Sequence, residues 1–240
     1  MTLDGTRTWL VGDRDIAIID PGPYLEDHIA AVVREVDGAR VVALLLTHEH
    51  PDHAGAAGAL ASRVGATVRS IARGNLDEGD AIPTDDGDIV TLHTPGHTPD
   101  HAAFHYPPQQ AVFCGDLMMG GQATALVAPP EGDLADYLTS LARIRELEPL
   151  VIHPAHGPSF DDPRVAIDAY FAHRAQRLDQ MLQALADGPL PIAAIVEAVY
   201  RRSIPEALGD AAHGATLAYL HYLERQGRVS EKAGEWWRTE

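Results

Sequence analysis

Apolar residues recur with two different periods in the first third of the chain, and the two periods predict two kinds of element. Short, nearly continuous apolar runs are typical of buried strands, whereas apolar residues three and four positions apart are typical of amphipathic helices. These patterns predict strands at 8–11, 16–19, 41–46 and 67–71 and helices at 24–36 and 54–64. Strands that alternate with helices in this way indicate an α/β core.

The middle of the chain predicts several more strands and two further helices. Strands are expected at 89–93, 102–105, 111–113 and 150–152, and a helix is expected at 133–147. Asp162 and Pro163 are typical of a helix start, because aspartate can cap the first turn and proline fits its first position. We expect this helix to run to Ala186 and to stop at Asp187-Gly188-Pro189.

The segment after this stop has the pattern of a small second domain. Helical spacing predicts helices at 192–200 and 205–226, and the residues at 229–237 indicate a β-hairpin. Helices followed by a hairpin indicate a winged-helix-like domain at 189–240, which follows a first domain at 1–188. From Leu190 onward the chain carries six basic and seven acidic residues, which weakens a DNA-binding interpretation of this domain.

Composition and charge exclude several classes of protein. Lys and Arg number 18 against 35 Asp and Glu, and the resulting formal net charge of −17 disfavours capture of nucleic acid through phosphate neutralisation. The single cysteine, Cys114, excludes a disulfide scaffold and a cysteine-built zinc site. Neither a signal-peptide pattern nor an apolar run long enough for a membrane span is present. We therefore expect a cytoplasmic globular protein that does not bind membranes.

One short segment concentrates metal-binding side chains. The sequence Thr47-His48-Glu49-His50-Pro51-Asp52-His53 directly follows a predicted buried strand. Imidazole and carboxylate groups suit zinc, and also manganese or iron. His48 and His50 can project to one side of an extended loop, whereas Asp52 and His53 face a second position. Because four ligands this close would crowd a single ion, the segment favours two adjacent ions.

Three more potential ligands each follow an apolar strand of their own. They are His97 in Thr94-Pro95-Gly96-His97-Thr98, Asp116 in Cys114-Gly115-Asp116 and His156 in Ala155-His156-Gly157. In α/β proteins, sites are built from the loops at the carboxyl ends of strands. Four such loops carrying histidine or aspartate predict one common site and argue against a solvated loop with incidental histidines.

The order of these residues resembles the metal-ligand set of the metallo-β-lactamase-fold hydrolases. That set is His-x-His-x-Asp-His followed by a histidine, an aspartate and a histidine, and all seven positions are present. The resemblance implies an αββα sandwich, in which two packed sheets have helices on both outer sides and hold a metal pair at one edge. It implies that the first ion is held by His48, His50 and His97, the second by Asp52, His53 and His156, and that Asp116 bridges them.

Further segments resemble the β-lactamase-like protein 2 group of this family. They are Leu3-Asp4-Gly5-Thr6, Leu10-Val11-Gly12, Pro99-Asp100-His101, Ala128-Pro129-Pro130-Glu131-Gly132-Asp133, Pro154-Ala155-His156-Gly157-Pro158 and Ala172-His173-Arg174. The sequence departs from the group at two points. Ala155 stands where glycine is usual, and the chain opens where the family has a preceding strand, so we expect a short N-terminus and an incomplete sheet edge.

A metal pair implies a definite reaction. Two divalent cations about 3.5–4 Å apart lower the pKa of a shared water from about 15.7 toward about 7, which provides hydroxide at neutral pH. That hydroxide attacks an electrophilic carbonyl carbon or phosphorus atom while one cation polarises the substrate oxygen. Asp52 is expected to act as a catalytic residue as well as a ligand, because it can orient the attacking water. Zinc is the expected ion, with iron or manganese as alternatives.

Other side chains carry weaker predictions. Cys114 lies on a predicted strand, and we expect it to be a small buried residue. His101 and His153 are close in sequence to predicted ligands, and we expect them to support those ligands or to contact substrate. His173, Arg174 and Arg177 share one stretch of predicted helix, where packing against the first domain and binding of a substrate anion are both open.

Several functions remain open on the sequence alone. Hydrolysis of a small thioester or ester is favoured, because glyoxalase II-like enzymes share the ligand order and a stretch similar to His97-Thr98-Pro99. Endoribonuclease activity is implied for some members of the β-lactamase-like protein 2 group, and a local phosphate path for RNA could be lined by Arg174, Arg177, Arg201 and Arg202. A lactonase or a β-lactamase is less favoured, since zinc-thiolate lactamases have cysteine in place of Asp116. A non-catalytic binding protein would bury unpaired ligands at a cost in free energy. The oligomeric state is open.

Overall fold

The structure, a computed structural model, describes residues 5–121, 124–200 and 208–239. Contacts divide the chain into two compact units that are each assembled from separate segments. The first unit comprises Met1–Pro95, Asp100–Ala125 and Ser140–Arg164, and the second comprises Gly96–Pro99, Leu126–Thr139 and Val165–Glu240. The predicted boundary between residues 188 and 189 separates two continuous domains instead, and it stays a prediction.

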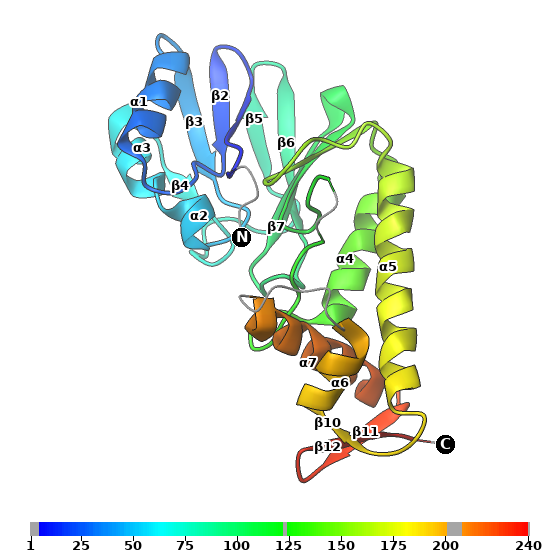
Figure 1. The fold of residues 1–240 in the computed structure, drawn as a ribbon. Helices are drawn as coiled ribbons and strands as arrows, with labels where there is room; N and C mark the ends of the chain where they lie inside the picture. Colours follow the sequence, from blue (N-terminus) through cyan, green and yellow to red (C-terminus); the bar gives the residue numbers. More distant parts are fainter. Residues whose placement is uncertain (1–4, 122–123, 201–207, 240) are drawn as a thin grey trace. The chain divides into compact units, whose positions relative to one another are not determined.

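The elements alternate much as the apolar pattern indicates (Figure 1). The strands are β1 Trp9–Val11, β2 Asp15–Ile19, β3 Arg40–Leu45, β4 Val68–Arg69, β5 Ala81–Thr84, β6 Gly87–His93, β7 Ala102–Tyr106, β8 Ala111–Gly115, β9 Val151–Pro154, β10 Leu190–Pro191, β11 Val229–Lys232 and β12 Glu235–Arg238. The helices are α1 Glu26–Glu35, α2 Pro51–Ala54, α3 Ala57–Val64, α4 Leu134–Glu146, α5 Pro163–Ala184, α6 Ile192–Tyr200 and α7 Gly209–Arg225, with a short 3-10 helix, η1, at Pro107–Gln109.

The first sheet has four strands in the order β1-β2-β3-β4. β1 pairs antiparallel with β2, whereas β2, β3 and β4 are parallel. β3 is mostly buried, which explains its nearly continuous apolar sequence. Because β2 and β3 are parallel, their carboxyl ends lie at one edge of the sheet. Asp20 follows β2 at this edge, and the loop that carries His48 and His50 follows β3.

The second sheet has five strands in the order β5-β6-β7-β8-β9. Its pairings are antiparallel except that β8 and β9 are parallel, so these two strands end at the same edge. Asp116 follows β8, and His156 follows β9. The sequence does not predict β5, because its Pro83 weakens the strand pattern. The structure accommodates that proline at the sheet's edge, where strands tolerate it.

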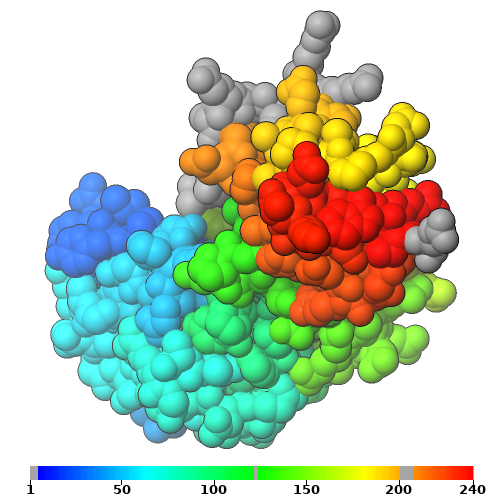
Figure 2. All heavy atoms as spheres, turned by 90° about the horizontal axis from the view of Figure 1, so that it is seen from below, coloured from blue at the N-terminus to red at the C-terminus, as the bar shows by residue number. Residues whose placement is uncertain are grey.

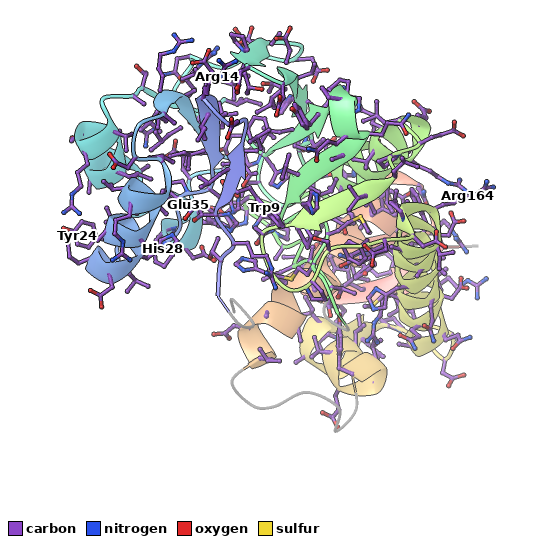
Figure 3. The ribbon with its side chains drawn as sticks, turned by 90° about the horizontal axis from the view of Figure 1, so that it is seen from above. Trp9, Arg14, Tyr24, His28, Glu35 and Arg164 are labelled. Carbon is purple, nitrogen blue, oxygen red and sulfur yellow. The ribbon has the colours of Figure 1, made fainter. Side chains whose placement is uncertain are left out.

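Side chains from both sheets pack into one apolar core. Ile19 and Leu45 come from the first sheet, and Phe104 and Phe113 come from the second. Trp9, labelled in Figure 3, packs against this core, and its ring centroid lies 5.6 Å from that of Phe113. Two sheets packed in this way confirm the predicted α/β sandwich.

α1 and α3 cover the other face of the first sheet (Figure 1). Ile29 and Val32 of α1 and Leu60 of α3 pack with Ile18 and Leu44 of the sheet in a separate apolar cluster. The spacing of these buried positions is the helical spacing seen in the sequence. The helices thereby bury the outer face of the sheet whose edge carries the histidine-rich loop.

One predicted helix is wrong at its start. The sequence predicts a single helix at 54–64, but the structure has two helices, α2 at Pro51–Ala54 and α3 at Ala57–Val64. Pro51 occupies the first turn of α2, where its fixed φ and missing N–H fit. The helix therefore begins inside the histidine-rich segment and carries Asp52 and His53 on its single turn.

The second unit contains most of α5 together with α6, α7 and a small sheet in the order β10-β12-β11. The hairpin predicted at 229–237 is confirmed as β11 and β12. The hairpin, red in Figure 2, lies beside α7, in orange, and β11 contacts that helix. The predicted start of this last helix, 205–207, falls outside the described residues. Within the described ranges, no helix combines the length and apolar character needed to cross a membrane.

Candidate metal centre

The histidine-rich loop divides its side chains between two backbone conformations. His50 immediately precedes α2 and has an extended ψ of 143°, whereas Asp52 and His53 lie within the helix. The backbone N–H of His53 donates to the carbonyl oxygen of His50 at 2.9 Å, which fixes the turn between them. His48 is fully buried just after β3. The two predicted pairs thus lie on different backbone conformations, and the prediction that each pair faces its own ion stays a prediction.

Four ligand atoms from three strand-end segments face one another in the first unit. Nε2 of His53 lies 3.4 Å from Oδ1 of Asp116 and 3.7 Å from Oδ2 of Asp52. Nε2 of His156 lies 3.3 Å from the same Asp116 oxygen and 3.4 Å from the same Asp52 oxygen. Two imidazole nitrogens and two carboxylate oxygens therefore converge on a small volume.

The buried nitrogens of this cluster fit a bound cation. Nε2 of His53 and Nε2 of His156 are shielded from solvent and make no hydrogen bond among the described residues. Leaving such atoms unsatisfied costs free energy, and histidine nitrogens facing carboxylate oxygens are the donor set that divalent transition metals prefer. Ligand atoms of Asp52, His53 and His156 all lie within 4.8 Å of one another, a spacing compatible with one ion.

His48 and His50 extend this cluster on the side of Asp116. Nε2 of His48 lies 2.9 Å from Nδ1 of His50, and Nδ1 of His48 lies 3.0 Å from the hydroxyl of Thr47. Ligand atoms of His48, His53 and Asp116 also lie within 4.8 Å of one another. His53 is the residue that these two groups share, and Oδ1 of Asp116 faces Nε2 of both His53 and His156, as a carboxylate between two ligand sets would.

The seventh predicted ligand, His97, belongs to the second compact unit. Its Nδ1 lies 2.7 Å from the carbonyl oxygen of Leu126, which can only accept a hydrogen bond. Nδ1 therefore carries the proton, which leaves Nε2 as the nitrogen of this ring that could bind a metal ion. The structure brings together the other six predicted ligands in the first unit.

Asp20 is a functional residue that the sequence reasoning missed. Its carboxylate accepts hydrogen bonds from the backbone N–H of Thr47 at 2.8 Å and from the Thr47 hydroxyl at 2.7 Å, and it lies 2.9 Å from Nδ1 of His53. It is buried and has a φ of +47°, a left-handed conformation that is uncommon outside glycine. The signal for it was present, since Asp20-Pro21-Gly22 ends a strand at the edge where the ligands gather.

The acidic surroundings of His53 change its protonation. Burial lowers the pKa of His53, but the carboxylates of Asp20 and Asp116 outweigh burial and raise that pKa to about 10. Within the protein alone, a proton on His53 thus balances part of the negative charge of the cluster. A divalent cation would supply the same compensation more strongly.

His101 supports the backbone next to Asp116. It is fully buried, its Nδ1 lies 2.9 Å from the Thr94 hydroxyl, and its Nε2 accepts a hydrogen bond from the backbone N–H of Asp116 at 3.2 Å. Because Nε2 accepts, the proton of the neutral ring sits on Nδ1. The ring thereby fixes the start of the turn from which the Asp116 carboxylate projects.

His153 projects into the core between the sheets. Its ring stacks on that of Phe113 with centroids 5.1 Å apart and lies 4.5 Å from that of Trp9. Nδ1 of His153 lies 2.8 Å from the Ser159 hydroxyl, and burial lowers the pKa of the ring. These contacts are structural, and a substrate contact of His153 stays a prediction.

The remaining predicted substrate residues lie on α5 in the second unit. Arg174 is buried, donates to the Tyr219 hydroxyl at 3.0 Å and lies 4.6 Å from the centroid of the Tyr137 ring. Arg177 lies 4.7 Å from the centroid of the Tyr200 ring. Burial, together with the charges of Arg174 and Arg177, lowers the pKa of His173 to about 4. Binding of a substrate anion by these three residues stays a prediction, and Arg201 and Arg202 lie outside the described residues.

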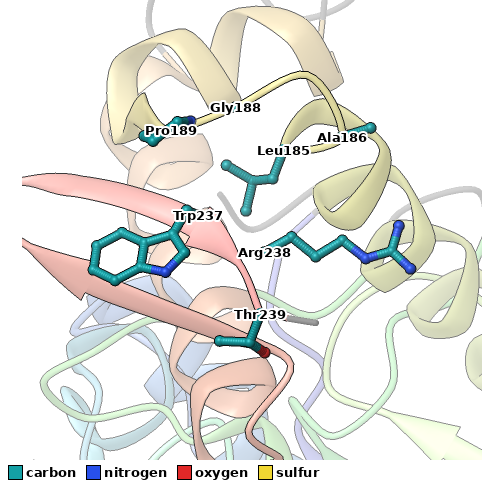
Figure 4. A pocket seen from close by; sticks show the side chains of 7 residues that line it. All are labelled: Leu185, Ala186, Gly188, Pro189, Trp237, Arg238 and Thr239. Carbon is teal, nitrogen blue, oxygen red and sulfur yellow. The ribbon is translucent and has the colours of Figure 1, made fainter.

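Two further features are separate from the ligand cluster. Cys114 is fully buried, and burial raises the pKa of its thiol, so the prediction of a small buried residue is confirmed. The second unit has an open pocket between the end of α5 and β12 (Figure 4). None of the predicted site residues is among those that line it, which are Leu185, Ala186, Gly188, Pro189, Trp237, Arg238 and Thr239.

Two family models match the chain. The model of the metallo-beta-lactamase superfamily matches residues 1–75 and 69–156, a range that includes all seven predicted ligands. The model of the beta-lactamase associated winged helix domain matches residues 192–236. The second match confirms the winged-helix-like tail predicted from the sequence.

Similar proteins cover most of the chain. A Drosophila melanogaster protein named beta-lactamase-like protein 2 homolog is 32% identical, over 98% of this chain and 88% of that protein. An Aspergillus chevalieri protein named atrochrysone carboxyl ACP thioesterase is 32% identical, over 85% of this chain and 70% of that protein. The crystal structure of a beta-lactamase domain protein from Burkholderia ambifaria superposes with a TM-score of 0.84 and 25% identity, over 97% of this chain and 86% of that one.

Proposed function

This chain belongs to the metallo-β-lactamase superfamily and is a hydrolase of that superfamily, and from this membership and its ligand cluster we propose that it hydrolyses a small thioester or ester with two divalent metal ions. The observation that carries the proposal is the convergence of His53, His156, Asp52 and Asp116 through buried ligand atoms. Zinc is the ion we expect, since imidazole and carboxylate ligands suit it well.

The ligands divide into two sets joined by one carboxylate. Asp116 supports this division, because its Oδ1 faces both His53 and His156 while its ligand atom also lies within 4.8 Å of that of His48. In this proposal His48, His50 and His97 would hold the first ion and Asp52, His53 and His156 the second, and Asp116 would be a ligand of both.

The protein's own groups prepare the reaction. When bound, two divalent cations would supply Lewis acidity, which makes hydroxide available near neutral pH and polarises the substrate's carbonyl oxygen. Asp52 is half-buried at the edge of the cluster, so its carboxylate can accept a hydrogen bond from the attacking water and orient it. The Asp20 carboxylate lies against Nδ1 of His53 and so orients its ring. It also accepts hydrogen bonds from the backbone N–H and the hydroxyl of Thr47, which fixes the loop that carries His48. No serine or cysteine nucleophile is needed.

The substrate class rests on one relative and on charge. The Aspergillus chevalieri relative is named an ACP thioesterase, which favours a thioester for this chain. The formal net charge of −17 disfavours a polyanion such as RNA, although a local cationic path could still bind one. Endoribonuclease activity is therefore the alternative that the experiment must distinguish from thioester hydrolysis.

The test compares substrates in parallel with metal analysis. Purified protein reconstituted with zinc is assayed on an acyl thioester, a lactone, a β-lactam and single-stranded RNA. We expect kcat/KM to be highest on the thioester and two equivalents of metal per chain. A chelated, metal-free sample that kept full activity would contradict the mechanism, and preferential cleavage of RNA would overturn the substrate class.

A ligand variant separates chemistry from folding. His50→Ala removes one imidazole from a half-buried loop position, so we expect loss of metal and of nearly all hydrolysis with an unchanged circular dichroism spectrum. Arg14→Ala is the matched control, because Arg14 is an exposed residue in the β1–β2 turn whose side chain pairs with Asp85. The control should keep full metal content and activity.

A further inference from the structure

We propose that residues 5–8 form a strap that sets the ring orientation of His156, and that Arg7 is a positioning residue for the second metal ion. The inference rests on the proposed function, since it assumes that His156 is a metal ligand. It concerns a segment that precedes β1 and contains none of the seven predicted ligands. Three sets of contacts carry it: two join the strap to the His156 loop, and the third joins it to Asp20, which supports His53.

The first contact fixes the proton of the His156 ring. Nδ1 of His156 lies 3.1 Å from the carbonyl oxygen of Gly5. A carbonyl oxygen only accepts, so Nδ1 must carry the proton and Nε2 keeps its lone pair. That Nε2 is the atom that faces Asp52 and Asp116. The Gly5 carbonyl therefore selects the tautomer that a metal ion needs.

The second contact is the pair of hydrogen bonds that Arg7 makes on either side of His156. Its backbone N–H donates to the carbonyl oxygen of Ala155 at 2.8 Å, and its side-chain Nε donates to that of Gly157 at 2.6 Å. Arg7 is thereby hydrogen-bonded to the residues on both sides of His156. The charged guanidinium makes the side-chain bond stronger than a neutral one would be.

The third contact links the strap to the loop behind His53. The Thr8 hydroxyl donates to the carbonyl oxygen of Asp20 at 2.9 Å, and it lies 2.9 Å from Nε2 of His28. Asp20 in turn supports His53. One short segment thus links the loop that carries His156 to Asp20, the residue that supports His53.

The fold of the His156 loop does not depend on the strap alone. The backbone N–H of Gly120 donates to the carbonyl oxygen of His156 at 2.8 Å, and Gly120 packs directly against Gly157. Removing the Arg7 side chain should therefore leave the loop folded while the ring of His156 becomes less well oriented. The expected effect is on metal binding, with little effect on unfolding.

The experiment compares two substitutions of Arg7. Arg7→Met keeps the length and removes the donor, whereas Arg7→Gln keeps an N–H donor at the same number of bonds from Cα. Loss of a group that orients a ligand weakens metal binding about 10–100-fold, so we expect Arg7→Met to weaken the second zinc ion about tenfold in chelator competition. Arg7→Gln should restore most of that affinity, and Arg14→Met should have no effect.

A backbone variant tests the Gly5 carbonyl. Gly5 has a φ of +113°, so Gly5→Ala would strain the backbone and turn the carbonyl away, although a Cβ there meets no atom within 4 Å. Gly38→Ala is the matched control, since Gly38 has a φ of +83° and is equally open. We expect Gly5→Ala, but not Gly38→Ala, to weaken metal binding. We also expect the ¹⁵N chemical shifts of the His156 ring in Gly5→Ala to show a smaller population of the Nδ1–H tautomer.

The outcomes separate this inference from the proposed function. A wild-type protein that takes up no metal would contradict the proposed function. The role of the strap would still be decided by the tautomer of the His156 ring, measured in the wild-type, Arg7→Met and Gly5→Ala proteins. A wild-type protein that binds two ions, with Arg7→Met and Gly5→Ala binding them equally well, would overturn the strap and leave the proposed function intact.

Discussion

Asp20 and His53 form a buried pair in which a carboxylate oxygen lies 2.9 Å from Nδ1 of the imidazole. The pair turns Nε2 of His53 toward Asp116. A carboxylate behind a metal-binding histidine fixes the ring and raises its basicity. We therefore expect Asp20 to contribute to metal affinity by orienting His53, without itself being a ligand.

Asp20→Asn should weaken metal binding without unfolding the protein. Asparagine has the same shape and tolerates the left-handed φ of this position, but it removes the charge and replaces one of the two acceptor oxygens by an NH2 donor. We expect affinity for the second ion to fall about 10–100-fold, measured by competition with a chelator. Asp15→Asn is the control, because Asp15 pairs with Arg40 at the other end of β2. Equal affinities for the two variants would contradict this role of Asp20.

His101→Leu should leave the backbone N–H of Asp116 buried without its acceptor. An unmet buried donor costs about 1–3 kcal/mol, so we expect a decrease of that size in the free energy of unfolding of the metal-free protein. His101→Gln offers an acceptor oxygen and should recover part of the loss. Denaturant titration measures both variants, and a wild-type stability for His101→Leu would show that the hydrogen bond is dispensable.

Gly115→Ala should be far more damaging than an ordinary glycine substitution. Gly115 has a φ of +51°, and a Cβ there would lie 2.7 Å from both Nε2 of His101 and Cβ of Thr47. The left-handed conformation alone costs about 1–2 kcal/mol for an L-residue, and the overlap adds to it. Gly65→Ala at the end of α3 has a φ of +69° in open space and measures the conformational cost alone. Equal losses of stability in thermal unfolding would rule out the overlap.

His173 should make the protein less stable as the solution becomes acidic. Its folded pKa of about 4 lies below the ordinary value of 6.5, so the unfolded chain binds a proton between these values while the folded chain does not. Stability therefore falls as pH decreases from about 7 toward about 4. His173→Gln removes this contribution, and its unfolding free energy should decline less over that range. Every other titratable group is common to both proteins, so the difference isolates position 173. Parallel pH profiles would refute the assignment.

The sequence predicts where the candidate ligands lie because each follows a strand whose pattern is clear. A loop that follows a buried strand has its place set by the sheet, so His48, Asp116 and His156 could be assigned to one edge before any coordinates. The hairpin and the alternation of strands and helices follow from apolar spacing in the same way. These features depend on local pattern and on topology alone.

Other features depend on contacts that no local pattern records. His153 lies on a strand beside a ligand loop, but whether its ring faces the site or the core depends on the register of β9, and it stacks on Phe113 in the core. Asp20 acts through residues far along the chain and through an unusual φ. Pro83 prevents the sequence pattern from predicting the edge strand β5, because proline is unfavourable at most positions of a strand.

The burial of Cys114 gives the protein a natural reporter of unfolding. The chain has one thiol, it sits at the end of β8 two residues before Asp116, and it is fully buried with a raised pKa. A thiol-reactive dye can therefore modify only molecules whose second sheet has opened, since reaction needs an accessible thiolate. The labelling rate of the wild-type chain would measure how often the second sheet opens. A decrease of that rate on adding zinc would measure how much a bound ion stabilises the closed sheet.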